Sequence, residues 1–250
     1  MKIKSLLMLG ALLMVSGAAM AQTTITSGNA KLISDNQVQL NYYYTNAEVM
    51  GGFQMVVSLP NGVTLEEDAQ KTTKGLSING GEAAPATFYN VVVPEGFECI
   101  GVKADVDGTT SDGTAYKAGD VLLVCFPVKA GAKYKATETP SRLCSLTLNA
   151  TSENNLESVA IKGFAGSDTE GTGGAEAAAK YAVAAGSQVS PAKVLKLGDV
   201  NGDTDVNALD IQDVISALVA MEYIDDGDVN NDEEVDALDI QDIISIIVNE

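Results

Sequence analysis

The sequence predicts a multi-domain protein in which an all-β sandwich, jelly-roll-like in type, is followed by a small all-α domain. Between Thr23 and about Phe164, apolar residues alternate with polar ones at a period of two, as in strands with one buried face. From Gly198 onward the period becomes helical, and the segment repeats itself. The chain of 250 residues is long enough for two domains.

The first 21 residues are predicted to be a signal peptide. A basic stretch at 1–4 is followed by an apolar run at 6–15 and by the small residues Ala19 and Ala21. Cleavage near Ala21 would leave Gln22 as the first residue of a secreted protein, in the periplasm or outside the cell. No later run reaches the roughly 18 apolar residues of a membrane span, so no membrane partner is expected.

Residues 22–190 are predicted to form the β-sandwich. Alternation is clearest at 38–44 and 53–59, and turn signals such as Pro60-Asn61-Gly62 separate the runs. Tyr42 and Tyr44 are expected in the core, whereas Tyr43 points to the opposite face and is the better surface candidate. Residues 165–180 are left open as loop, short helix or linker, 181–189 as a last strand, and 191–197 as the linker to the second domain.

Cysteine number leaves the redox state of the sandwich open. The chain has three cysteines, so at least one thiol has no partner within the chain. Cys125 and Cys144 lie in apolar runs and are expected to be buried strand residues. One disulfide is possible, and its pairing, including the state of Cys99, is not fixed by the sequence.

Charge excludes several classes of function. The chain carries 34 acidic residues, 15 basic residues and no histidine, a formal charge of −19. Such a chain is not expected to bind nucleic acid by releasing counterions, and no histidine-based catalytic site is possible. The acidic cluster Glu66-Glu67-Asp68 follows a turn and is interpreted as a solvated loop rather than a glycosidase carboxylate pair. We therefore expect no catalytic residues and no enzymatic activity.

The acidic charge is concentrated in a duplicated C-terminal segment. Residues 198–250 hold 16 of the acidic residues and no lysine or arginine. Residues 198–220 align with 227–249 at an offset of 29, with 15 identities in 23 positions. Duplication of this kind indicates two copies of one structural unit.

Each copy begins with a twelve-residue loop that has the spacing of calcium ligands. Calcium takes oxygen ligands, which such loops supply at positions 1, 3, 5, 7 through the backbone, 9 and 12. An oxygen-bearing residue occupies every one of these positions in both copies, which predicts two calcium ions. In the first loop the candidate ligands are Asp199, Asn201, Asp203, Asp205 through its carbonyl, Asn207 and Asp210. In the second loop they are Asp228, Asn230, Asp232, Glu234 through its carbonyl, Asp236 and Asp239.

Both loops depart from the usual pattern in the same places. Position 6 is normally glycine, because the chain turns sharply there, but these loops have Thr204 and Glu233. We expect a positive φ at both residues, and this conformation costs about 1 kcal/mol for each residue that has a Cβ. Position 8 is Val206 in one loop and Val235 in the other, which suggests that the loops pack back to back.

A short amphipathic helix is predicted after each loop. Apolar residues recur with the spacing i, i+3, i+4, i+7, which marks one buried face. These residues are Ile211, Val214, Ile215 and Leu218 in the first helix and Ile240, Ile243, Ile244 and Ile247 in the second. Because isolated helices of this length are marginal, we expect them to pack on each other and to depend on calcium for folding.

Residues 198–250 resemble a type I dockerin, on the strength of Gly-Asp-Val-Asn-Gly-Asp, Val206, Asn207, Asp210 and the second copy. The resemblance implies a calcium-dependent partner, the cohesin domain, in a polysaccharide-degrading system. Loops of this type usually have glutamate at position 12, but dockerins have aspartate there, as this chain does at Asp210 and Asp239. The resemblance also places partner contacts at positions 10 and 11 and further along each helix. The implied contact residues are Ala208, Leu209, Ile215, Ser216, Ala237, Leu238, Ile244 and Ser245.

The β half has a weaker resemblance, to a cohesin-like or carbohydrate-binding-module-like sandwich. It rests on the strand-like segments 52–63, 118–124 and 159–164. Together the two resemblances imply a secreted, non-catalytic adaptor whose sandwich binds a glycan or a protein. The alternatives are a carbohydrate-binding module that accompanies glycoside hydrolases and a small glycan-active enzyme.

Overall fold

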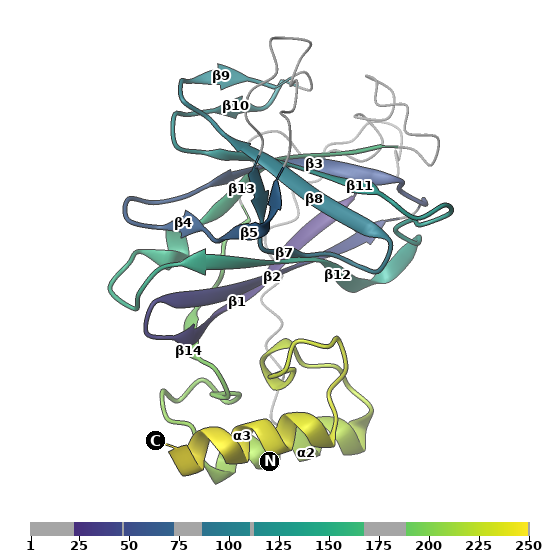
Figure 1. The fold of residues 1–250 in the computed structure, drawn as a ribbon. Coiled ribbons are helices and arrows are strands. Elements are labelled where there is room, and N and C mark those ends of the chain that lie inside the picture. Colours follow the sequence, from purple (N-terminus) through teal and green to yellow (C-terminus); the bar gives the residue numbers. More distant parts are fainter. Residues whose placement is uncertain (1–22, 47, 73–86, 111–112, 168–188, 250) are drawn as a thin grey trace, which may run out of the picture.

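The computed structural model describes residues 23–46, 48–72, 87–110, 113–167 and 189–249. Two β-sheets face each other, and two helices that lie side by side are placed beyond one of the sheets (Figure 1). The predicted order of an all-β sandwich followed by a small helical domain is confirmed. The predicted signal peptide, the possible helix at 175–180 and most of the possible strand at 181–189 lie outside the described residues.

The first sheet is the one that faces the helices. Its strand order is β14-β1-β2-β12-β4, with β7 also paired to β12. The strands are β1 (Thr24–Ser34), β2 (Gln37–Asn46), β4 (Thr64–Leu65), β7 (Val91–Val92), β12 (Thr137–Asn149) and β14 (Val194–Lys196). The long strands form the centre of the sheet, where β2 pairs antiparallel with β1 on one side and with β12 on the other.

The second sheet has the order β13-β3-β11-β8-β6-β5 and is antiparallel throughout. Its strands are β3 (Gly52–Ser58), β5 (Glu67–Thr72), β6 (Thr87–Tyr89), β8 (Phe97–Lys103), β11 (Val121–Pro127) and β13 (Ala160–Ser167). A small separate ribbon is made of β9 (Gly108–Thr109) and β10 (Ala115–Tyr116). The three-residue 3₁₀ turn η1 (Leu156–Ser158) precedes β13.

The core between the sheets is built by the period-two pattern. On β2, Val38, Leu40, Tyr42 and Tyr44 all belong to the buried cluster that joins the two sheets, as predicted. The second sheet contributes Phe53, Met55 and Val57 from β3 to the same cluster. Each of these side chains leaves water, at roughly 25 cal/mol per Å² of apolar surface.

The structure settles the cysteine pairing that the sequence left open. Cys99 on β8 and Cys125 on β11 stand opposite each other in adjacent strands and are joined by a disulfide. Cys144, on β12, is a free thiol buried in the core, as predicted. Burial raises the pKa of this thiol to about 12.

Two sequence expectations about the sandwich are wrong. Glu67 and Asp68 do not lie in a solvated loop; they begin β5, because Glu67 pairs with Tyr89 of β6. The neighbouring Glu66 is held by Gln37 Nε2 and Asn90 Nδ2, each 2.6 Å from its carboxylate. Residues 191–197 are likewise no free linker. Val194–Lys196 pair in parallel with β1, which ties the chain to the sheet just before the helical part begins.

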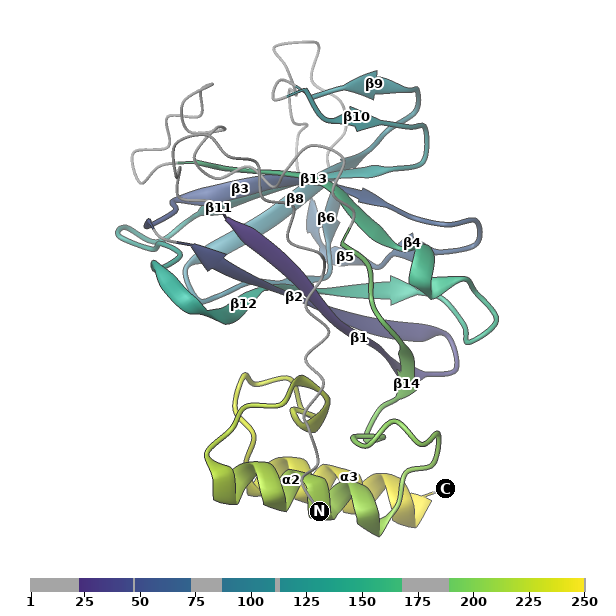
Figure 2. The same cartoon turned by 180° about the vertical axis from the view of Figure 1, so that it is seen from behind.

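The C-terminal repeat domain (residues 198–249) contains two helices, α2 (Ala208–Ala220) and α3 (Ala237–Asn249), and the short 3₁₀ turn η2 (Asp225–Gly227) between them. The helices lie side by side, and the connection between them reaches toward the first sheet (Figure 2). Among the described residues, no helix has the length and apolar character needed to cross a membrane.

Candidate functional site

The first loop (Asp199–Asp210) is held together by its own carboxylates. Asp199 accepts hydrogen bonds from the backbone N–H groups of Gly202, Asp203 and Thr204, at 2.9, 3.0 and 3.0 Å. Asp210 accepts from Val200 and Asn201 through one oxygen and from Asn207 through the other. Asn207 is also the N-cap of α2, so the loop and the helix start form one unit.

The second loop (Asp228–Asp239) repeats this network at the offset of 29 residues. Asp228 accepts from the N–H groups of Asp232 and Glu233, and Asp239 accepts from Val229, Asn230 and Asp236. Asp236 caps α3 by accepting from Leu238 N–H at 2.6 Å. In each loop the carboxylates of positions 1 and 12 therefore bind backbone N–H groups of the same loop.

The loop residues fit a hard cation by donor type and by burial. Asp199, Asp210, Asp228 and Asp239 are all buried, although aspartate is rarely buried without a partner. No described lysine or arginine forms an ion pair with Asp199, Asp210 or Asp239. Across the described residues, however, no three acidic side chains stand close enough together to form a metal site as they are.

Position 6 has the backbone conformation that was predicted. Thr204 has a φ of 83° and Glu233 a φ of 72°. This left-handed region disfavours residues with a Cβ, and a β-branched threonine most of all. Position 4 is also left-handed, with Gly202 at 73° in the first loop and Asn231 at 62° in the second.

The two repeats share one small core, which confirms that the loops and helices pack on each other. Val206, Val214, Val229 and Ile243 are its buried members, and Val235 packs against them. The predicted apolar stripe is wrong at one position in each helix. Ile215 and Ile244 are exposed, because the buried face of α2 runs through Val214 and Ala217 instead.

The exposed positions form matching surfaces on the two helices. All eight residues that the resemblance implied as partner contacts are exposed. Leu209 and Leu238 are 53% and 50% exposed, and Ile215 and Ile244 are 45% and 46% exposed. Single exposed apolar residues are ordinary on proteins, but here each helix presents a leucine and an isoleucine at the same two positions.

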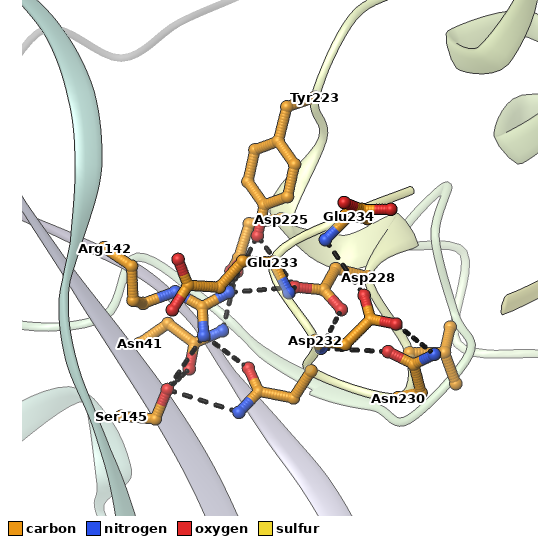
Figure 3. Close-up of polar contacts among 12 residues, drawn as sticks. Asn41, Arg142, Ser145, Tyr223, Asp225, Asp228, Asn230, Asp232, Glu233 and Glu234 are labelled. Carbon is orange, nitrogen blue, oxygen red and sulfur yellow. Dashed lines mark hydrogen bonds and ion pairs between the residues drawn. The ribbon is translucent and has the colours of Figure 1, made fainter. Parts of the chain in front are cut away.

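A polar contact that no sequence pattern predicted joins the two domains (Figure 3). Arg142 of β12 donates to Asp228 Oδ2 at 2.9 Å, to Tyr223 Oη at 2.8 Å and to Asn231 Oδ1 at 2.6 Å. Lys31 of β1 forms an ion pair with Asp225 at 3.5 Å, and Asn41 of β2 donates to the same carboxylate at 2.7 Å. We call Lys31, Asn41, Tyr43, Arg142 and Ser145 the docking face. Lys31 and Arg142 lie on the outer side of the sheet, and they are buried because the repeat domain covers them. Their burial therefore follows from the tertiary structure.

Tyr43 illustrates this point. It lies on the face opposite to Tyr42 and Tyr44, as predicted, but it is not a surface residue, because the repeat domain covers it. Its hydroxyl donates to Asp225, and the Arg142 guanidinium lies 5.4 Å from its ring centre. The expectation that Tyr43 is a surface residue is therefore wrong.

Burial and like charges shift the pKa of groups in this contact. Burial raises the pKa of Tyr43, and the Asp225 carboxylate raises it further. Burial also raises the pKa of Asp226, again with a contribution from Asp225. Burial lowers the pKa of Arg142, but Tyr43, Tyr223 and Asp225 more than offset this, so the guanidinium remains charged.

Known proteins resemble the two halves of the chain to different degrees. Two cohesin structures overlap the chain, a non-cellulosomal cohesin from the archaeon Archaeoglobus fulgidus and the type II cohesin A11 from Bacteroides cellulosolvens. The first has 16% identity and a TM-score of 0.31 and covers 70% of this chain and 87% of its own. The second has 11% identity and a TM-score of 0.33 and covers 68% and 98%.

At these TM-scores the overlap carries no assignment, and the sandwich architecture rests on its own strands. No curated protein matches the chain in sequence. The C-terminal part is different, because it matches a family model over almost the whole of the repeat domain. Residues 197–248, with their two loops and two helices, match the dockerin type I domain.

Proposed function

We propose that this chain is a secreted, non-catalytic adaptor whose repeat domain binds a cohesin-type domain when two calcium ions are bound. The observation that carries the proposal is the duplicated loop-and-helix unit, in which both copies present the same ligand oxygens and the same exposed residues. The dockerin type I match over residues 197–248 supports the class of partner.

Calcium has a specific part in this proposal. Bound at the two loops, it would neutralise the buried carboxylates of positions 1 and 12, and it would fix the loop ends from which α2 and α3 begin. Asn207 and Asp236 serve as N-caps and as candidate ligands, so metal binding sets the helix positions directly. α2 then presents Leu209 and Ile215, and α3 presents Leu238 and Ile244.

The alternatives receive less support. Glycosidases use paired carboxylates in a cleft. The densest acidic cluster of the sandwich is used instead in β5 and in the Glu66 hydrogen bonds. A hollow of about 400 Å³ lies over the loop Pro127–Lys133, whose residues include no aspartate or glutamate. A glycan-binding role for the sandwich loses its best aromatic candidate, because Tyr43 is covered.

The test is a binding measurement between the chain that starts at Gln22 and a panel of purified type I and type II cohesin domains. Surface plasmon resonance in calcium and in excess chelator is expected to show binding in calcium only. Leu209→Asp combined with Leu238→Asp should abolish binding while leaving calcium uptake unchanged. Retention of the chain on a polysaccharide and on none of the cohesins would support the carbohydrate-binding alternative.

A matched control separates loss of the surface from loss of the fold. Val219 and Val248 are also exposed and apolar, but they lie at the far ends of the helices. The pair Val219→Asp and Val248→Asp should therefore leave binding intact. The proposal fails if the chain takes up no calcium, or if the leucine variants bind the same cohesin as tightly as the natural chain.

A further inference from the structure

The docking face holds the repeat domain by its second loop and by Tyr223, Asp225 and Asp226, which precede that loop. We infer that the docking face holds the second loop in the form that binds calcium, so that calcium binding at this loop and docking of the two domains strengthen each other. The inference rests on the proposed function, since it takes both loops as calcium sites. It adds that the two sites are unequal, because the second loop has side-chain hydrogen bonds to the docking face through Asp228 and Asn231.

The first step is the position of Asp228. Its counterpart Asp199 is held only by N–H groups of its own loop. Asp228 Oδ2 accepts, in addition to Glu233 N–H, the Arg142 guanidinium and the Tyr223 hydroxyl, at 2.9 and 3.0 Å. Asp228 Oδ1 accepts only the N–H of Asp232. Arg142 of the sandwich, together with Tyr223 of the repeat domain, therefore binds one of the two oxygens of the position-1 carboxylate and fixes the rotation of that carboxylate.

The second step is the turn at position 4. The first loop uses Gly202 there, and glycine adopts a positive φ without strain. The second loop has Asn231, which reaches the same left-handed region with a side chain. Arg142 donates to Asn231 Oδ1 at 2.6 Å, and Asn231 Nδ2 donates to Ser145 Oγ at 3.4 Å. The sandwich therefore holds in place the one turn that glycine makes unaided in the first loop (Figure 3).

The third step is the fit of η2 against β1. Lys31 is 3% exposed and binds Asp225, and Asn29 Nδ2 donates to Asp226 at 2.8 Å. Gly28 leaves room for this contact, because a Cβ at that position would lie 2.2 Å from Asp225 Oδ2. Gly28 itself makes none of the polar contacts of the second loop. Substitution at Gly28 therefore blocks docking without removing a charge.

The direction of the effect follows from the charges. A guanidinium near a calcium site opposes a second cation, but the second loop carries six acidic residues against this one arginine. When a group that hydrogen-bonds to a metal ligand and orients it is removed, metal affinity typically falls by about ten- to a hundredfold. We therefore expect orientation by Arg142 to outweigh its repulsion of calcium.

The experiment is a calorimetric calcium titration of the chain that starts at Gln22. In an Asp210→Ala background the second loop is titrated alone, and in an Asp239→Ala background the first loop is titrated alone. Arg142→Gln and Gly28→Val should each weaken the second loop on the order of tenfold. Both should leave the first loop within about twofold, which also shows that the variants are folded. Lys129→Gln removes one positive charge from an exposed ion pair elsewhere on the sandwich and should change neither site.

The outcomes separate the inference from the function on which it rests. Unchanged or tighter calcium binding at the second loop in both Arg142→Gln and Gly28→Val overturns the inference and leaves the proposed function standing. Weakening by Arg142→Gln alone also overturns it, because the arginine would then act without docking. Absence of calcium binding in the unsubstituted chain overturns the proposed function itself.

Discussion

Position 6 of the first loop offers a direct test of backbone strain in a calcium loop. Thr204 has a φ of 83°, and its N–H donates to Asp199 at 3.0 Å, so the backbone cannot leave this conformation without losing a loop hydrogen bond. Thr204→Gly removes the Cβ that makes this region unfavourable. We expect the substitution to tighten calcium binding at the first loop.

The magnitude follows from two opposing terms. A residue with a Cβ in the left-handed region costs roughly 1–2 kcal/mol. Glycine gives back about 0.5–1 kcal/mol of this, because it loses more backbone freedom when the loop becomes ordered. The net gain is about 0.5–1 kcal/mol, which corresponds to calcium binding that is about two- to fivefold tighter.

The assay is calorimetric titration in the Asp239→Ala background, where only the first loop is complete. Thr204→Ala is the matched control, because it removes the β-branch but keeps the Cβ, and it should recover only a small part of the gain. Gly202→Ala in the same loop should weaken binding, since position 4 has a φ of 73° and its new Cβ would lie 3.1 Å from Lys193 Nζ. If Thr204→Gly binds calcium no more tightly than Thr204→Ala, the strain argument is wrong.

Four further predictions concern burial, redox state and metal dependence. In a denaturant titration with calcium, Ile243→Ala should lower the free energy of unfolding of the repeat domain by about 2–5 kcal/mol, because Ile243 is buried. The neighbouring Ile244 is exposed, so Ile244→Ala should lower this free energy by less than about 1 kcal/mol and weaken cohesin binding instead. Equal losses of stability would contradict the assigned helix face. Thiol titration should detect almost no reactive cysteine in the native chain, one after denaturation and three after reduction, because Cys144 is buried with a pKa of about 12 and Cys99 is bonded to Cys125. Opening this disulfide should lower the stability of the sandwich by up to about 3.5 kcal/mol for a loop of this length, as checked by urea unfolding with and without reductant. Excess chelator should reduce helical circular dichroism, since the caps of α2 and α3 lie in the loops, and an unchanged spectrum would argue against metal-dependent folding.

Much of the candidate site was readable from the sequence, because its information is local. The twelve-residue spacing names every candidate ligand, and an offset of 29 residues locates the second copy without any knowledge of packing. Positive φ at Thr204 and Glu233 followed from the position that the loop type gives them. The alternation on β2 likewise assigned Tyr42 and Tyr44 to the core, since a strand sends neighbouring side chains to opposite faces.

Predictions were less accurate where a local pattern allowed more than one partner. Apolar spacing marks a face of a helix but leaves its centre uncertain by about one residue, which is why Ile215 and Ile244 were assigned to the core. The strand β14 is only three residues long and is stabilised by pairing with β1, so its own sequence gave no strong signal. The disulfide required strand register, because the pairing of Cys99 with Cys125 depends on β8 and β11 being neighbours.

The sequence by itself determined the two kinds of domain, the duplicated loops and the oxygen-bearing residues along them, because each depends on residues close together along the chain. Only the tertiary structure decided what the two domains do to each other. Arg142 and Asp228 are 86 positions apart, and no periodicity links a sheet arginine to a distant loop carboxylate. A buried charge becomes favourable only when its partner is brought to it, and that partner is fixed by the whole fold.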